Sequence, residues 1–261
     1  MAQLPARDVS LIASLPGWLR RPPPAVEPDR WARTRRSIPW VQPLSGEHED
    51  TLRTLTAYFL HTKAITPLGG LVLDADQRAR LAALCCLPLL GIGETGLRGW
   101  SQLLVYPDAF RATRSHLDAS GVMHEYEEEL IGESWQMGPL VLSWADVQAD
   151  LEDPWAGYCV AIHEMAHKLD ALDGAMDGTP PLPRTWQREW AADFQRSYDA
   201  FCRQVDAGNE TAIDPYASES PEEFFAVTSE YHFSAPALLK AGMPEVAAHL
   251  RRFYGWPPLQ E

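Results

Sequence analysis

The chain has 261 residues, of which 46% are hydrophobic and 22% are charged, so it is long enough to form a globular protein with a substantial core. Its formal net charge of -14 argues against direct, sequence-independent binding to nucleic acid, because such binding requires a basic face. The acidic charge is compatible with a basic partner or substrate, but solubility alone is enough to explain it.

Residues 1–45 predict an irregular N-terminal arm. This segment is rich in proline and arginine, and we expect Trp18, Trp31 and Trp40 to pin it to the rest of the chain. Any helix within it should be short. The remaining residues, 46–261, carry the patterned helices and strands and are predicted to form one domain.

The sequence predicts neither a membrane span nor a secretion signal. The longest apolar run, at residues 81–93, is interrupted by Pro88 and is too short to cross a bilayer. At the start of the chain the arginines stand among or after the apolar residues, which is the reverse of a signal peptide. None of the cysteines forms a C-x-x-C pair, which favours buried thiols in a reducing compartment. We therefore expect a cytoplasmic protein with no membrane partner.

The apolar periodicity predicts an α+β fold that is mainly helical. Helices are expected, besides the one that carries the central motif, over residues 47–63, 76–90, 185–206, 220–233 and 244–254. Strands are expected at residues 71–73, 103–106, 121–129 and 138–144. All four strands precede the motif helix, so we expect one small mixed sheet before it. The last strand is either an ordinary edge strand or an edge to which an extended peptide adds.

The central motif is the pentad His163-Glu164-Met165-Ala166-His167, an H-E-x-x-H sequence. On a helix, residues four apart share a face, so both imidazoles can reach one metal ion. Glu164 lies one position round and can face a water bound to that metal, which is the arrangement of a zinc-dependent hydrolase. The alternative is a helix whose two histidines are satisfied by hydrogen bonds alone. The apolar surroundings favour the metal, because buried polar groups need partners.

A catalytic zinc site requires a third protein ligand, and the downstream acids are the candidates. Asp170 lies further along the helix axis, away from the point where the imidazoles meet, so it fits a supporting role better than a ligand. Glu222 and Glu223 stand in the first turn of a later predicted helix. Glu223 precedes an apolar run, where an acid is costly unless it binds something positive, whereas Glu222 fits a solvated position. Glu230, seven residues later, could support the site or cap a neighbouring element.

Two segments together resemble the Mlc titration factor A family of bacterial zinc peptidases. One is the motif with its continuation H-E-M-A-H-K-L-D at 163–170, and the other is S-P-E-E-F-F-A-V-T-S-E at 220–230. The similarity covers roughly residues 50 to 240. It also includes L-P-L-L at 87–90, G-E-S-W at 132–135, G-P at 138–139 and L-S-W at 142–144.

The resemblance implies a zincin-like metallopeptidase domain of the gluzincin type with one Zn²⁺ per chain. The family's zinc ligands correspond to His163, His167 and Glu223, and its catalytic base corresponds to Glu164. Its active-site tyrosine corresponds to Tyr216, which the residues alone would equally allow as a packing residue. The resemblance further implies a peptide substrate, peptidase or aminopeptidase activity and, in enterobacteria, binding to the glucose repressor Mlc.

Two classes of function are therefore open. The first is a zinc peptidase of aminopeptidase type, linked through a Mlc-like repressor to the regulation of sugar uptake. The second is a regulatory binding protein that sequesters a transcriptional repressor, with little catalysis. The intact Glu164 favours the enzyme, because a purely structural metal site has no need of a general base.

Overall fold

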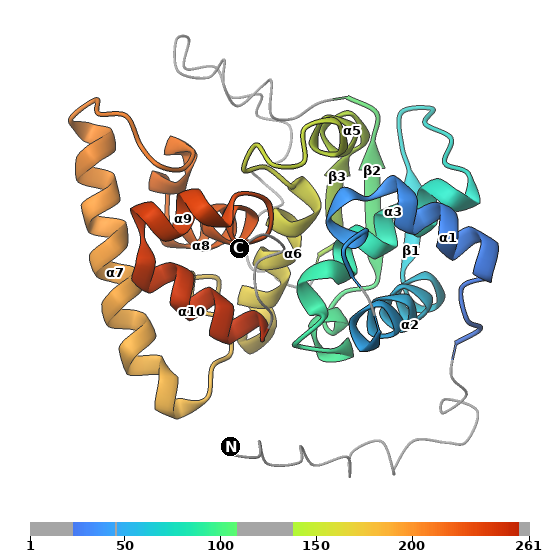
Figure 1. Cartoon of the computed structure of the whole chain (residues 1–261), viewed down its shortest axis with the longest axis horizontal. Coiled ribbons are helices and arrows are strands. Elements are labelled where there is room, and N and C mark those ends of the chain that lie inside the picture. Colours follow the sequence, from blue (N-terminus) through green and yellow to red (C-terminus); the bar gives the residue numbers. More distant parts are fainter. Residues whose placement is uncertain (1–22, 45, 109–137, 256–261) are drawn as a thin grey trace.

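The computed structural model describes residues 23–44, 46–108 and 138–255. Trp18, the strand expected at 121–129 and the segment 132–135 lie outside the described residues. Figure 1 shows α6 (Val160–Asp170) between two groups of elements, the first comprising the sheet with α1–α3 and the second comprising α7–α10. α6 packs on α3, α5, α8 and β3. Within the described ranges, no helix combines the length and hydropathy that a bilayer crossing requires.

The sheet of the described residues consists of three strands in the order β1-β2-β3. These strands are β1 (Ala64–Pro67), β2 (Gln102–Tyr106) and β3 (Leu140–Ser143), and both pairs are parallel. The expected mixed sheet is therefore wrong for this part of the chain. Parallel neighbours require a crossover connection, and α3 (Ala75–Cys86) lies in the connection between β1 and β2. β3 lies at one edge of this sheet, beside α6.

The first strand also lies earlier than predicted. The apolar run at 71–73 is not a strand, and its Val72 is 83% exposed. This run leads directly into α3, where Asp74 forms a capping box with Gln77. β1 instead begins directly after α2 (Glu47–Thr62). The pairing of β1 with β2 and the cap of α3 thus fix the two ends of this loop. Residues 71–73, which lie between them, pair with no strand of the described structure.

The described part of the N-terminal arm forms a regular helix, α1 (Pro28–Ser37), followed by a short 3₁₀ turn at Pro39–Val41. Trp31 is buried, and its Nε1 donates a hydrogen bond to Glu49 at 3.0 Å. Trp40 is fully buried, and its Nε1 donates to the carbonyl oxygen of Pro154 at 2.9 Å. These two tryptophans pin the segment as expected. The division into an arm and a single domain from residue 46 remains a prediction.

The second half of the chain is helical. Its elements are α5 (Trp144–Glu152), α7 (Arg184–Asp206), α8 (Pro221–Ser234), α9 (Pro236–Gly242) and α10 (Pro244–Tyr254). α7, α8 and α10 lie within a residue or two of their predicted bounds, whereas α5 and α9 were not expected. Aromatic side chains join these helices: Trp190 of α7 stacks on Phe194 with ring centroids 4.1 Å apart, and both approach Phe225 of α8. The outer helices thus support α8 against α6.

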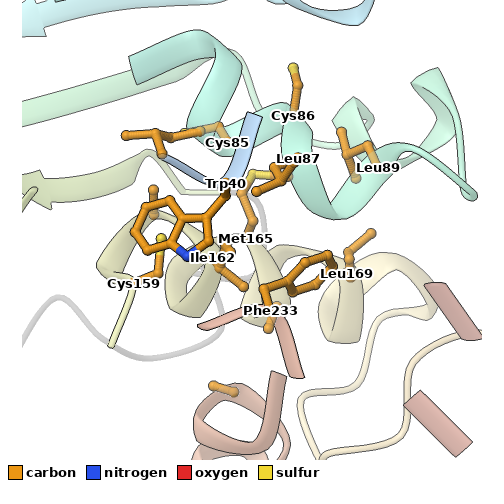
Figure 2. Close-up of a cluster of buried hydrophobic side chains, with 14 of the residues drawn as sticks. Trp40, Cys85, Cys86, Leu87, Leu89, Cys159, Ile162, Met165, Leu169 and Phe233 are labelled. Atoms are coloured by element: carbon orange, nitrogen blue, oxygen red, sulfur yellow. The ribbon is translucent and has the colours of Figure 1, made fainter. Parts of the chain in front are cut away.

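The apolar side of α6 is buried in the core, which fixes the position of the motif helix. Ile162, Met165 and Leu169 have no exposed surface, and Figure 2 shows them gathered with Trp40 and with Phe233 of α8. The cysteines behave as small core residues: three are buried and one is half-buried, and no disulfide joins any of them in the described ranges. They are Cys85, Cys86, Cys159 and Cys202. Because α6 is held on its apolar side, the direction of its polar side chains is fixed.

Candidate metal centre

Two helices bring three donor side chains together. On α6, the Nε2 atoms of His163 and His167 lie 3.2 Å apart. On α8, Glu223 places Oε2 at 3.1 Å from Nε2 of His163 and Oε1 at 3.5 Å from Nε2 of His167. The donor atoms all lie within 4.8 Å of one another, and no second group of this kind exists among the described residues. The structure therefore assembles the same three residues that the family resemblance implies as ligands.

The start of α8 explains how Glu223 reaches this position. Ser220 is the N-cap residue, and its Oγ accepts a hydrogen bond from the backbone N–H of Glu223 at 3.3 Å. Pro221 occupies the first helical position, where its missing N–H costs nothing. Glu223 is thus the third residue of the helix, near the positive end of the helix dipole, which favours a carboxylate. The local sequence sets the helix start, and the packing of α8 on α6 brings the carboxylate to the histidines.

The distances fit a tetrahedral metal ion. Zinc bonds of about 2.0–2.2 Å place tetrahedral ligand atoms roughly 3.3–3.5 Å apart. The two Nε2 atoms lie 3.2 Å apart, and each has one oxygen of the Glu223 carboxylate beside it, Oε2 at 3.1 Å and Oε1 at 3.5 Å. Within the described structure, Oε2 of Glu223 is buried without a hydrogen bond, although it lies 3.1 Å from the His163 ring nitrogen. A cation would satisfy this oxygen together with both ring nitrogens. The donor set, two imidazoles and one carboxylate, also matches that of a catalytic zinc.

Glu230 fixes the ring of His163. Its Oε1 lies 2.7 Å from Nδ1 of His163, and its Oε2 accepts a hydrogen bond from the backbone N–H of Cys159 at 2.6 Å. A proton on Nδ1 leaves the lone pair of Nε2 directed toward Glu223 and His167, which is the tautomer that a metal ligand needs. Glu230 therefore performs both roles expected for it. It supports the site through His163, and it accepts a hydrogen bond from a backbone N–H at the N-terminus of α6.

The electrostatics of the cluster favour positive charge. Burial disfavours the charged form of His163, but the carboxylates of Glu230 and Glu223 outweigh burial and raise the pKa of His163 to about 10. Burial alone would raise the pKa of Glu223, but the two neighbouring histidines lower it well below its usual value. Two carboxylates around one imidazole thus stabilise a cation between them, which is the property of a metal site.

The two predicted catalytic residues lie beside this cluster. Glu164 follows His163 on α6 and is half-buried. Tyr216 lies in a short 3₁₀ turn, Pro215–Ser218, and its ring centroid is 6.3 Å from that of His163. The structure therefore gathers His163, His167, Glu223 and Tyr216 at the junction of α6, α8 and this turn, with Glu164 next to His163 on α6.

Asp170 is not part of the donor cluster. It is fully buried, and its Oδ2 accepts a hydrogen bond from the backbone N–H of Gly178 at 2.8 Å. Burial raises the pKa of Asp170 to about 6 against the opposing effect of that N–H group. Within the described residues, Oδ1 of Asp170 and Nδ1 of His167 are both buried without a hydrogen-bond partner. Asp170 thus holds the loop after α6 and lies outside the donor cluster.

Lys168 lies near the site and was not predicted from the sequence. Lys168 is buried, and its Nζ donates a hydrogen bond to the carbonyl oxygen of Gly138 at 2.9 Å, directly before β3. Burial lowers the pKa of Lys168, while the charge of Glu164, four residues earlier, opposes that change. A glutamate followed by a lysine at this helical spacing is the signal that could have identified the pair.

Comparison with known proteins identifies the family. Residues 18–255 match the model of the family described as glucose-regulated metallo-peptidase M90. Mlc titration factor A of Serratia proteamaculans is 36% identical over 245 residues, which cover 93% of this chain and 92% of the relative. Mlc titration factor A of Yersinia enterocolitica is also 36% identical, over 93% of this chain and 91% of the relative. These matches confirm the resemblance seen in the motifs, and the chain belongs to the glucose-regulated metallo-peptidase M90 family.

Proposed function

We propose that this protein is a zinc-dependent peptidase of the gluzincin type, and that His163, His167 and Glu223 hold one Zn²⁺. The observation that carries the proposal is that one carboxylate reaches two imidazoles whose Nε2 atoms lie 3.2 Å apart. Oε2 of Glu223 lies 3.1 Å from His163 and Oε1 lies 3.5 Å from His167, close to the spacing of ligands around a tetrahedral ion. Two imidazoles with one carboxylate suit zinc better than magnesium or calcium, which prefer oxygen ligands alone.

The chemistry divides between the metal and the chain. A bound zinc supplies a Lewis acid that acidifies water and polarises a peptide carbonyl. Glu164 accepts the proton of the attacking water and passes it to the leaving amine. Tyr216 donates a hydrogen bond to the oxygen on which negative charge develops, and its position beside His163 supports this role. Glu230 keeps the His163 ring in the orientation and tautomer described above.

The activity can be tested with peptide p-nitroanilides. Wild-type protein is expected to release nitroaniline, to lose this activity with a chelator, and to regain it when zinc is restored. The aminopeptidase preference is tested by comparing substrates that have a free N-terminus with the same substrates after acetylation. Loss of hydrolysis on acetylation supports an aminopeptidase, whereas equal rates support an endopeptidase. If wild-type protein with a full zinc site cleaves none of a broad peptide set, the peptidase proposal fails.

Replacing Tyr216 by phenylalanine is expected to lower kcat without changing zinc content. The hydroxyl acts on charge that appears only in the transition state, so kcat should fall more than KM rises. Loss of one such donor costs on the order of 10²-fold in kcat. Steady-state kinetics measures this, with Tyr58→Phe as the control, because Tyr58 packs on the core from α2. An unchanged kcat in Tyr216→Phe would demote Tyr216 to a packing residue.

Replacing Glu230 by glutamine is expected to weaken zinc binding by roughly 10- to 100-fold, as for other groups that orient a ligating histidine. The amide has the same shape, but it cannot accept hydrogen bonds on both sides from His163 and from the N–H of Cys159. Competition with a fluorescent zinc chelator measures the affinity. Glu222→Gln, on the same helix, is the control and should bind zinc as wild type does. Equal affinities in the two variants would remove Glu230 from the site.

A second function is suggested by the relatives, whose name, Mlc titration factor A, refers to Mlc. We propose that this chain also binds a Mlc-like transcriptional repressor in the cytoplasm. Purified repressor and the inactive Glu164→Gln variant give the test, because binding should survive the loss of catalysis. If the repressor binds while wild-type protein cleaves no peptide, the alternative of a regulatory binding protein with little catalysis is the better description.

A further inference from the structure

Asp214 connects separate segments of the chain beside Tyr216. Its Oδ1 accepts a hydrogen bond from the backbone N–H of Tyr216 at 2.9 Å, which caps the 3₁₀ turn that carries this tyrosine. Its Oδ2 accepts a hydrogen bond from the hydroxyl of Tyr158 at 2.9 Å. The two carboxylate oxygens thus serve partners that are far apart in the sequence.

Tyr158 is itself fixed to the metal-binding helices. It directly precedes Cys159, the N-cap residue of α6, whose N–H is held by Glu230. Its ring makes an edge contact with Tyr231 of α8, with centroids 6.5 Å apart. The neighbouring Gly157 has a φ of +99°, and a Cβ there would lie 2.5 Å from the Tyr231 ring. The Tyr158 hydroxyl, which donates to Asp214, therefore belongs to a segment that packs tightly against α8.

Tyr231 adds a second hydroxyl at the same place. Burial first, and then the charge of Asp214, raise the pKa of Tyr231 to about 12. The hydroxyl of Tyr231 therefore stays protonated, and its ring forms one wall of the contact with Tyr158. The carboxylate of Asp214 thus binds the segment before α6 directly, and its charge acts on a tyrosine of α8.

The other end of the same turn is held by α7. The hydroxyl of Tyr198 donates a hydrogen bond to the carbonyl oxygen of Ser218 at 3.0 Å, and Oγ of Ser218 donates to the carbonyl oxygen of Pro215 at 2.8 Å. These contacts fix the outer part of the turn. Asp214 fixes the part that faces α6, which determines where the side chain of Tyr216 enters the site.

We propose that Asp214 and Tyr158 are positioning residues for Tyr216. The Asp214 carboxylate ties the turn to the segment before α6, so that Tyr216 is held beside His163 at the observed 6.3 Å between ring centroids. This inference rests on the proposed role of Tyr216 in catalysis. It assigns no contact with the substrate to either positioning residue.

Three graded variants test the inference kinetically. Tyr158→Phe removes one hydrogen bond to Asp214, Asp214→Asn keeps the shape but loses the charge, and Asp214→Ala removes both bonds. We expect kcat to fall progressively, by on the order of 10-fold in Asp214→Ala, with KM within about twofold of wild type, because a small misplacement of a catalytic group lowers the rate of the chemical step. Zinc content should not change.

The double-mutant cycle with Tyr216→Phe separates positioning from general destabilisation. If Asp214 acts through the Tyr216 hydroxyl, Asp214→Asn should cause no further fall in kcat once that hydroxyl is absent. Asp74→Ala is the matched control, because Asp74 also caps a helix but lies at the start of α3, away from the site. It should lower the melting temperature without lowering kcat. A full additional loss in the Tyr216→Phe background would overturn the proposal.

Hydrogen–deuterium exchange gives a readout that does not depend on activity. Peptides spanning residues 213–219 should exchange faster in Asp214→Ala than in wild type, and at the wild-type rate in Asp74→Ala. Unchanged exchange in Asp214→Ala would overturn the positioning role, whether or not the protein proves to be a peptidase. Faster exchange in Asp214→Ala, together with a wild-type protein that cleaves no peptide, would instead keep the structural link and reject the proposed function.

Discussion

Replacing Glu164 by glutamine is expected to remove nearly all peptide hydrolysis while leaving the fold and the bound metal in place. The amide has almost the shape of the carboxylate, but it cannot accept the proton of the attacking water. General-base catalysis contributes on the order of 10²- to 10⁴-fold, so kcat should fall by that amount. Steady-state kinetics measures the loss, and elemental analysis of the same preparation measures the zinc content.

Two further variants sharpen this test. Glu164→Asp keeps a carboxylate but draws it back toward the helix, so it should retain a measurable part of the activity that glutamine loses. Glu152→Gln is the matched control, because Glu152 is exposed at the end of α5, outside the metal cluster. Wild-type rates in purified Glu164→Gln would reject the general-base role and leave the metal and Tyr216 to account for catalysis.

The half of the site that lies on α6 could be predicted from the sequence because its geometry is local. Residues four apart on a helix face the same direction, and the two imidazole nitrogens lie 3.2 Å apart as a consequence. The helix start at Ser220 and Pro221 is also a local signal, which is why the bounds of α8 were predicted closely.

The third donor could not be predicted from periodicity. Glu222, Glu223 and Glu230 all belong to the same helix, and only the packing of α8 on α6 decides which carboxylate meets the histidines. Glu223 and Glu230 both reach His163, but they reach opposite nitrogens of its ring. The apolar run after Glu223 favoured this residue over Glu222, and the family resemblance assigned it as the ligand.

The sheet shows a second limit of the sequence. Hydrophobic alternation indicates that a segment is a strand but carries no information on the direction of its neighbour, so the parallel order was not foreseen. The short strand Ala64–Pro67 has too few residues to show a pattern, whereas the apolar run at 71–73 resembles a strand yet exposes Val72. Pairing with β2 through backbone hydrogen bonds, not composition, selects the first of these segments.

Replacing Glu223 by alanine is expected to weaken zinc binding by more than roughly 100-fold. Loss of a group that only orients a ligand costs up to about that much, and loss of a ligand itself should cost more. Only His163 and His167 would then remain as protein donors, and two imidazoles do not complete a catalytic zinc site. Competition with a chelator measures the affinity, and hydrolysis should fall in parallel. Glu222→Ala removes a neighbouring first-turn acid of α8 and should bind zinc as wild type does.

Asp170→Asn tests the competing assignment of the third ligand. Asp170 is buried and binds the N–H of Gly178, but it lies outside the donor cluster, so this variant should keep its zinc. The asparagine retains an oxygen for the N–H of Gly178, which limits the effect on the loop. Full zinc retention in Glu223→Ala together with loss in Asp170→Asn would move the third ligand to Asp170. The reverse result would assign it to Glu223, whose carboxylate oxygens lie 3.1 Å from Nε2 of His163 and 3.5 Å from Nε2 of His167.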